Sequence, residues 1–160
     1  TVGVAPRRVV VFGAGGAVRA VVAALLGLGV ERIDIINRSE TRAQTLAHDL
    51  GPRRLRVHPM EMADDRLRGA EMVVNGLPAA ANPWVIERAF STMAPMGRVL
   101  DLGYGPRVLP VRAAVTSAER EFRDGLEMLA RQGVAAFALW TGVQSPLKPV
   151  LSALRSAVLD

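Results

Sequence analysis

The sequence predicts an α/β fold in which helices cover both faces of a doubly wound, mostly parallel sheet. Runs of β-branched and other apolar residues, such as RVVVFG at 8–13, are typical of strands buried on both faces of a parallel sheet. These runs alternate with helical segments of about ten residues or more, which implies right-handed βαβ crossovers. The sequence has no repeat of solenoid length, so a single α/β domain is expected.

Six strands are predicted, most of them from short runs rich in apolar residues. In chain order they occupy residues 8–13, 32–37, 54–57, 71–75, 97–103 and 121–123. The third and the last of them are short. A helix or a partly helical stretch separates each strand from the next, as the fold requires.

Helices are predicted where apolar residues recur with helical spacing. In chain order they cover 15–28, 40–50, 84–91, 110–120, 125–139 and about 146–158, with a polar, partly helical stretch through Arg68. Gly29 is expected to end the first helix. Ser39 is a suitable N-cap for the second, which ends at Gly51, and Pro146 marks the start of the last.

Length and composition limit the class of protein. A chain of 160 residues can bury one sizeable core, whereas two complete domains would be cramped. Its longest apolar runs, such as 21–26, are far shorter than the roughly 20 residues of a membrane span, so no membrane is expected. The lack of cysteine excludes disulfides and thiolate metal sites and favours a cytoplasmic location. The N-terminus has neither an initiator Met nor a signal-peptide pattern, so we expect it to lie inside a longer protein.

The positive charge comes almost entirely from arginine. The formal net charge is +5, and Lys148 is the only lysine among 20 basic residues. No nucleic-acid partner is expected, because the few aromatic residues are scattered and form no stacking platform. The one dense basic run, PRRLRV at 52–57, is best explained as a solvated face or strand edge, with a nucleic-acid patch as the alternative.

A glycine-rich turn follows the first predicted strand. GAGG at 13–16 opens a helix, and the second strand ends at Asn37, 24 positions after Gly13. This is the arrangement of a dinucleotide-binding, Rossmann-like βαβ unit. Gly13 permits the tight turn, while Gly15 and Gly16 let the backbone approach a pyrophosphate at a helix N-terminus. The alternative is a glycine turn that binds no ligand.

The residues after the second strand predict NADP rather than NAD. NAD-specific sites usually place Asp or Glu here to bind the ribose 2′-hydroxyl, whereas this chain has the neutral Asn37. Arg38 can stack on adenine and donate to a 2′-phosphate, Ser39 adds a hydroxyl, and Arg42 returns to the same helix end. Asp34 is less suitably placed for the ribose. The alternative is that Arg38 and Arg42 only form a solvated helix face.

Several segments together resemble the C-terminal, NADP-binding domain of shikimate dehydrogenases, in the family's order and over almost the whole chain. GAGGAVRA is similar to G-A-G-G-x-x-R-A, and NRSETRA is similar to N-R-T-x-x-R-A. DLGYGPRVLPV resembles D-x-x-Y-x-P-x-x-T-x-L, and DGLEMLARQGVAAFALWTG resembles D-G-x-x-M-L-x-x-Q-x-x-x-A-F-x-x-W-T-G. In this variant of the turn Val18 replaces the third Rossmann glycine, and close packing is expected at Ala20 instead. The resemblance implies one NADP-binding domain over 1–160, whose final helix at 146–158 packs toward a missing N-terminal substrate domain.

The resemblance also implies roles for individual residues. The pyrophosphate would be held by Gly13, Ala14, Gly15, Gly16 and Ala17, and the 2′-phosphate by Asn37, Arg38, Ser39 and Arg42. The loop NGLP would pass the cofactor through Asn75, Gly76 and Leu77, although Leu77 replaces a Thr of the family and so lacks its hydroxyl. Leu102 and Gly125 would line the nicotinamide, with Met128 also on the cofactor side, and Tyr104 and Gln132 would contact the substrate.

The residues themselves support the last two assignments. Gln132 is at helical spacing from Gly125 and Met128 on an otherwise small or apolar face, where an amide needs a partner. That partner is either the substrate or neighbouring backbone. Tyr104 follows the carboxyl end of a strand, where doubly wound sheets bind ligands, and the alternative is an ordinary half-buried loop aromatic.

The activity implied by the resemblance is the reversible reduction of 3-dehydroshikimate to shikimate by NADPH, in the chorismate pathway of aromatic amino acid biosynthesis. The reaction needs a group that moves the hydroxyl proton, which in the family is a Lys and Asp pair of the N-terminal domain. No residue of this chain matches that pair. Lys148 is expected at the surface, His48 and His58 are expected to be structural, and no metal site is expected. Asp101, at a strand end, is a possible acid, but it matches a family position that is better explained as structural.

We therefore expect this chain to bind NADP(H) but to catalyse poorly or not at all by itself. Two alternatives stay open: a non-catalytic module for ligand sensing or regulation, and an enzyme for quinate, aminoshikimate or another related hydroxy acid. The sequence does not indicate an oligomeric state.

Overall fold

The computed structural model describes residues 5–51 and 53–159 and confirms the predicted α/β fold. Within these residues the sheet has six strands, all parallel, in the spatial order β3–β2–β1–β4–β5–β6. The strands are β1 (Arg8–Phe12), β2 (Arg32–Ile36), β3 (Leu55–His58), β4 (Met72–Asn75), β5 (Arg98–Asp101) and β6 (Glu121–Arg123). The strand order reverses between β1 and β4, and ligands of doubly wound sheets bind at the carboxyl ends of the strands beside such a switch point.

Helices connect the strands and follow the last one. They are α1 (Gly16–Gly27), α2 (Glu40–Leu50), α3 (Ala63–Leu67), α4 (Asn82–Ile86), α5 (Leu109–Ser117), α6 (Leu126–Thr141) and α7 (Leu147–Leu159). Short 3-10 turns are η1 (Met60–Met62), η2 (Ala79–Ala81), η3 (Phe90–Thr92) and η4 (Gly105–Val108). None of the helices described is both long enough and apolar enough to cross a membrane.

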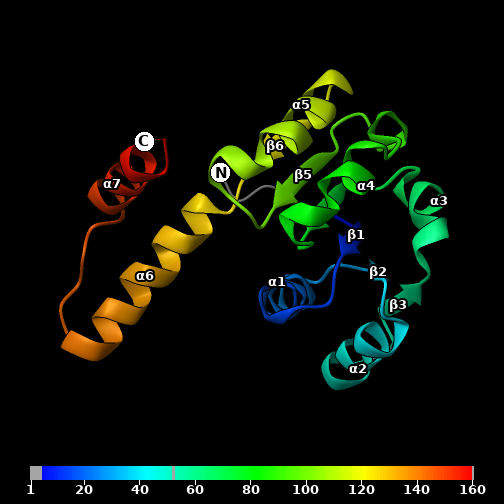
Figure 1. The fold of residues 1–160 in the computed structure, drawn as a ribbon. Helices are drawn as coiled ribbons and strands as arrows, with labels where there is room; N and C mark the ends of the chain where they lie inside the picture. Colours follow the sequence, from blue (N-terminus) through cyan, green and yellow to red (C-terminus); the bar gives the residue numbers. More distant parts are fainter. Residues whose placement is uncertain (1–4, 52, 160) are drawn as a thin grey trace.

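Two apolar clusters hold the helices on the sheet, one on each face. Figure 1 shows α1 and α2 on one side of the sheet and α4 and α5 on the other. Successive residues of β1 serve both sides: Val9 and Val11 pack under α1 and α2. Val10 and Phe12 pack under α3, α4 and α5. All four side chains are at most 1 % exposed, which explains why this strand is an uninterrupted apolar run.

The C-terminal helices depart from this layered arrangement. α6 extends away from the body of the domain, and α7 folds back beside it (Figure 1). α7 also contacts η4, where Val158 lies against Gly105. On the outer half of α6, Leu139 and Trp140 are each 84 % exposed. The chain therefore presents an apolar surface on α6.

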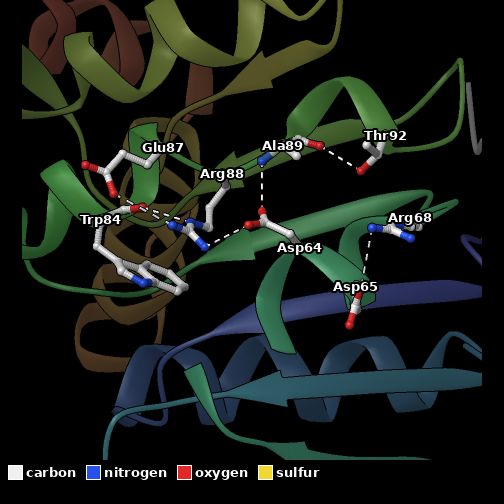
Figure 2. Close-up of polar contacts among 8 residues, drawn as sticks. All are labelled: Asp64, Asp65, Arg68, Trp84, Glu87, Arg88, Ala89 and Thr92. Atoms are coloured by element: carbon white, nitrogen blue, oxygen red, sulfur yellow. Dashed lines mark hydrogen bonds and ion pairs between the residues drawn. The ribbon is translucent and has the colours of Figure 1, made fainter. Parts of the chain in front are cut away.

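The helix predicted over 84–91 is wrong in its bounds, because α4 spans only Asn82–Ile86. Figure 2 shows the reason. Asp64 of α3 accepts a hydrogen bond from the N–H of Ala89 (2.9 Å) and pairs with Arg88 (3.0 Å). The Nε of Arg88 donates to the carbonyl of Trp84 (3.0 Å). The bond from Ala89 to Asp64 and the bond from the Arg88 side chain to Trp84 take backbone groups that would have extended the helix, so α4 stops early.

Replacing Arg88 by Gln is expected to destabilise the domain by about 1–2 kcal/mol, because the side chain loses a charged partner and an aromatic one. The guanidinium carbon lies 4.4 Å from the centroid of the Trp84 ring, and the side chain is 13 % exposed. Urea unfolding measures the change in the free energy of unfolding. Arg68→Gln is the matched control, because Arg68 forms only an exposed pair with Asp65 and is expected to contribute less than about 0.5 kcal/mol. Equal losses in both variants would contradict this interpretation.

Candidate functional site

The turn after β1 is fixed by the conformation and the packing of Gly13. This residue has a φ of +106°, a region that favours glycine. Its N–H donates to the carbonyl of Ile36 (2.8 Å), which ties the turn to the end of β2. A Cβ on Gly13 would lie 3.1 Å from backbone atoms of Gly76, in the turn after β4. The predicted tight turn is therefore present, and it packs closely against the neighbouring turn.

Close packing between α1 and the sheet occurs at Val18, not at Ala20. Val18 is 1 % exposed, whereas Ala20 is on the exposed side of α1, so the expectation for Ala20 is wrong. A side chain on Gly76 would overlap Val18 and would approach the carbonyl of Phe12 at 3.3 Å. The small residue needed for this approach is therefore supplied by Gly76 of the adjacent turn, and Val18 fills the space that it leaves.

The first turn of α1 forms an open surface beside this contact. Ala14 is half-buried, while Gly15, Gly16 and Ala17 are exposed. A Cβ built on Gly15 or Gly16 would meet no atom within 4 Å. The first N–H groups of a helix have no partner within the helix, and this first turn carries no acidic residue. These glycines are therefore available for the close approach of an anion.

The residues predicted to hold a 2′-phosphate meet at the N-terminus of α2. Ser39 is the N-cap, and its Oγ accepts from the N–H of Arg42 at 3.5 Å. Asn37 donates through Nδ2 to the carbonyl of Ser39 (2.7 Å), which closes the turn before the helix. Arg38 and Arg42 are exposed, and neither forms an ion pair with another described residue. Both guanidinium groups can therefore donate to an anion beside the end of β2.

Asp34 is not available to a ribose, in agreement with the sequence interpretation. Its side chain is 2 % exposed and pairs with Arg32 (2.8 Å) and with Nε2 of His58 (2.6 Å). This contact also gives His58 the structural role expected of it. His48 lies at the surface near Asp49.

Asn75 and Asp101 join the carboxyl ends of β4 and β5. The Nδ2 of Asn75 donates to Asp101 (2.7 Å), and its Oδ1 accepts from the N–H of Leu77 (3.2 Å). The second oxygen of Asp101 accepts from the N–H of Gly103 (2.8 Å). Burial raises the pKa of Asp101, although these hydrogen bonds and the charge of Arg107 act in the opposite direction. The two side chains therefore position the turns after both strands and have little surface left to touch a ligand directly.

Leu102 and Gly125 lie together at the start of α6. The N–H of Gly125 donates to the carbonyl of Gly103 (2.7 Å), and a side chain on Gly125 would overlap the carbonyl of Leu102. Met128 follows on the first turn of α6 and is half-buried. The structure thus places Leu102 after the carboxyl end of β5 and against the N-cap of α6, with Met128 in the first turn of that helix.

The two predicted substrate residues are on different elements. Tyr104 directly precedes η4 and is half-buried under the guanidinium of Arg107, 5.0 Å from the ring centroid. Gln132 is exposed on α6, two turns after Gly125, and its amide forms no hydrogen bond with the described residues. Among the described residues, therefore, no backbone group forms a hydrogen bond with the Gln132 amide.

Backbone hydrogen bonds link the turns of the site in a series. The carbonyl of Ile36 accepts from Gly13, that of Phe12 from Gly76 (2.8 Å), and that of Asn75 from Leu102 (2.8 Å). The bond from Gly125 to Gly103 continues the series to α6. Each turn of the site is therefore attached to the neighbouring strand or turn.

A cavity of about 310 Å³ opens among these turns. Its walls include Ala17 of α1, the loop from Gly76 to Ala79, the segment from Asp101 to Gly103, and Asn82, Arg107 and Val108. Sequence reasoning missed Asn82, which lies outside the quoted motifs, and Arg107, which stands at a position where its motif specifies no residue. Within the described residues, no group of three or more His, Asp or Glu side chains could hold a metal ion.

Comparison with protein-family models gives two matches. Residues 2–110 match the model described as "Shikimate / quinate 5-dehydrogenase", and residues 125–155 match "Shikimate 5'-dehydrogenase C-terminal domain". A shikimate dehydrogenase (NADP(+)) of Xanthomonas oryzae pv. oryzae is 37 % identical over 158 residues, which cover 94 % of this chain and 54 % of the relative. One from Thioalkalivibrio sulfidiphilus is also 37 % identical and covers 96 % and 56 %. The chain thus spans just over half the length of the curated relatives that it matches.

Solved structures show the same similarity. The shikimate dehydrogenase of Mycobacterium tuberculosis has a TM-score of 0.79 at 31 % identity, over 93 % of this chain and 57 % of that one. A Thermus thermophilus shikimate 5-dehydrogenase in complex with NADP(H) and shikimate has a TM-score of 0.70 at 32 % identity, over 93 % and 54 %. Because a family model matches more than half of its residues and the fold agrees, this chain belongs to the shikimate dehydrogenase family.

Proposed function

We propose that the chain is the NADP(H)-binding domain of an oxidoreductase that interconverts 3-dehydroshikimate and shikimate. The observation that supports the proposal is that two sites able to bind an anion lie at the carboxyl ends of the adjacent strands β1 and β2. These are the open first turn of α1, and Arg38 and Arg42 at the start of α2, which form no ion pair with the residues that the structure describes. A dinucleotide with a 2′-phosphate carries negative charge at both of these places.

The preference for NADP over NAD rests on the end of β2. Asp34 is occupied by Arg32 and His58, so it cannot bind the ribose hydroxyls. The relatives from Xanthomonas and Thioalkalivibrio carry NADP(+) in their names. A quinate dehydrogenase from Corynebacterium glutamicum, solved in complex with NAD, is similar in fold at 24 % identity. We therefore attribute the preference of this chain for NADP over NAD to Arg38 and Arg42.

The residues of this chain bind and orient rather than move a proton. A bound nicotinamide would supply the hydride. Leu102, Gly125 and Met128 would form the apolar wall against it, and Tyr104 and Gln132 would hold the polar groups of the substrate. Asp101 is the one buried acid beside the cavity in the described chain, and both of its oxygens accept hydrogen bonds. We therefore expect the proton-transferring residues to lie outside these 160 residues.

The exposed surface of α6 is consistent with proton-transferring residues that belong to another domain. Leu139 and Trp140, in the C-terminal half of α6, are each 84 % exposed, and α6 extends away from the body of the domain with α7 beside it (Figure 1). We propose that this surface and α7 pack against a substrate-binding domain, as the family resemblance implies.

Titration with NADPH and NADH tests the cofactor assignment. We expect tighter binding of NADPH, and we expect Arg38→Gln to weaken NADPH by about tenfold while leaving NADH nearly unchanged. Arg98→Gln is the matched control, because Arg98 is an exposed arginine at the amino end of β5, whereas Arg38 follows the carboxyl end of β2. Equal affinity of the native chain for the two nucleotides would refute the NADP preference.

A steady-state assay with shikimate and NADP tests the second part of the proposal. We expect no turnover by the 160-residue chain, or turnover far below about 1 per second. A higher rate would mean that a residue of this chain transfers the proton.

A second candidate function is a non-catalytic module that senses its ligand. The observation that favours it is Leu77, which presents an alkyl side chain to the cavity where the family pattern has a hydroxyl. Binding of NADPH without any activity, even in the natural full-length protein, would favour this candidate. Turnover of quinate by that protein in preference to shikimate would identify the substrate instead.

A further inference from the structure

Arg107 of η4 extends a positive charge over the edge of the cavity. Its guanidinium carbon lies 5.0 Å from the centroid of the Tyr104 ring, and its Nε would be 3.1 Å from a Cβ on Gly103. Its backbone is anchored as well, because its carbonyl accepts a hydrogen bond from Nδ2 of Asn82 (2.6 Å). The side chain is thus held by stacking against the segment that forms one wall of the cavity.

The charge of Arg107 acts on the buried Asp101, but no carboxylate of the described residues forms an ion pair with this arginine. Arg107 is also the one cation among the described residues that line the cavity. Asp101 also lines the cavity, but its two oxygens accept hydrogen bonds from Asn75 and Gly103. The donors of the Arg107 guanidinium are therefore available to an anion that enters the cavity.

The position of the cavity indicates which anion this is. The cavity is also lined by Ala17, an exposed residue of the first turn of α1, where a dinucleotide would place its diphosphate. We infer that Arg107 binds the diphosphate of the dinucleotide at the phosphate nearer the nicotinamide. This inference rests on the proposed function. The position follows Pro106 in the segment DLGYGPRVLPV and is one at which the family pattern specifies no residue.

Three ligands separate this role from other roles of Arg107. NADPH has the whole diphosphate, and 2′-phospho-ADP-ribose keeps the diphosphate but lacks nicotinamide. Adenosine 2′,5′-bisphosphate keeps the 2′-phosphate and the adenosine-side phosphate of the diphosphate, but it lacks the phosphate nearer the nicotinamide. Arg107→Gln is expected to weaken the first two by roughly tenfold and to leave the third within about twofold. Arg112→Gln is the matched control, because Arg112 also lies over an aromatic ring, that of Phe122 at 5.7 Å, but does not line this cavity.

The outcomes distinguish this inference from the proposed function. If the native chain binds none of the three ligands, the proposed function fails and the inference fails with it. If it binds them and Arg107→Gln changes nothing, only the inference fails. An equal loss of affinity for all three ligands would also overturn the inference, because it would indicate a general structural effect. A loss with NADPH alone would overturn it too, because it would indicate a contact with the nicotinamide riboside. A loss confined to shikimate binding would assign Arg107 to the substrate carboxylate instead.

Discussion

Asn75→Asp is expected to destabilise the domain by about 3 kcal/mol, and adding Asp101→Asn to the same chain is expected to restore most of that loss. The single change places a second carboxylate 2.7 Å from Asp101 in a buried site. The reciprocal single change, Asp101→Asn, leaves two amide nitrogens facing each other. The exchanged pair again has one donor facing one acceptor, and it keeps acceptors for the N–H groups of Leu77 and Gly103.

Urea unfolding of the native chain, both single variants and the exchanged pair measures this coupling as a double-mutant cycle. The Asn75→Asp variant should also recover stability as the pH falls, because one of two adjacent buried carboxylates must be protonated. Additive losses in the exchanged pair would contradict the described geometry. NADPH titration of the exchanged pair then tests whether the hydrogen-bond pattern, rather than the identity of the residues, positions the two turns.

Gly76→Ala is expected to destabilise the domain by about 2–3 kcal/mol through overpacking, because the new methyl group overlaps Val18. Val18→Ala alone is expected to lose about 1–2 kcal/mol by leaving a cavity under α1. Combining them should give a smaller loss than the sum, since the methyl at position 76 then occupies space that Val18 has vacated. Free energies of unfolding for the three variants measure the compensation.

Gly15→Ala is the matched control for Gly76→Ala. Its Cβ meets no atom within 4 Å, so stability should change by less than about 0.5 kcal/mol. The same methyl group would stand at the N-cap of α1, where the pyrophosphate is proposed to bind, and should weaken NADPH binding. A large loss of stability at Gly15, or full additivity between Val18 and Gly76, would contradict the packing described.

The fold was predictable because its strongest signals are local. The apolar run of β1 and the N-cap Ser39 are properties of neighbouring residues, and both are present as predicted. The early end of α4 was not predictable, since it depends on Asp64, 25 residues before the Ala89 N–H that it accepts from. The helical periodicity of 3.6 residues per turn reports only on neighbouring residues, so it does not indicate a partner so far away in the sequence.

The candidate site divides in the same way. The glycine turn and the residues Asn37 to Arg42 could be identified because a known chemistry requires those residue types at that spacing. Val18 can stand in place of a glycine because it packs against Gly76. Gly76 lies 58 positions further along the chain, so the local motif could not indicate this contact. Arg107 gave no sequence signal, because an isolated arginine in a loop becomes informative only through the cavity beside it.

The series of backbone bonds from Ile36 to Gly125 has a thermodynamic consequence. A loop that is disordered before binding loses conformational entropy when its ligand arrives, and this loss reduces affinity. Here the turns that surround the cavity are held by the N–H groups of Gly13, Gly76, Leu102 and Gly125, each of which donates to a backbone carbonyl of the protein itself. The crevice is thus preorganised, so its amide protons should exchange slowly in the free protein, and little of the binding free energy should be spent on ordering the backbone.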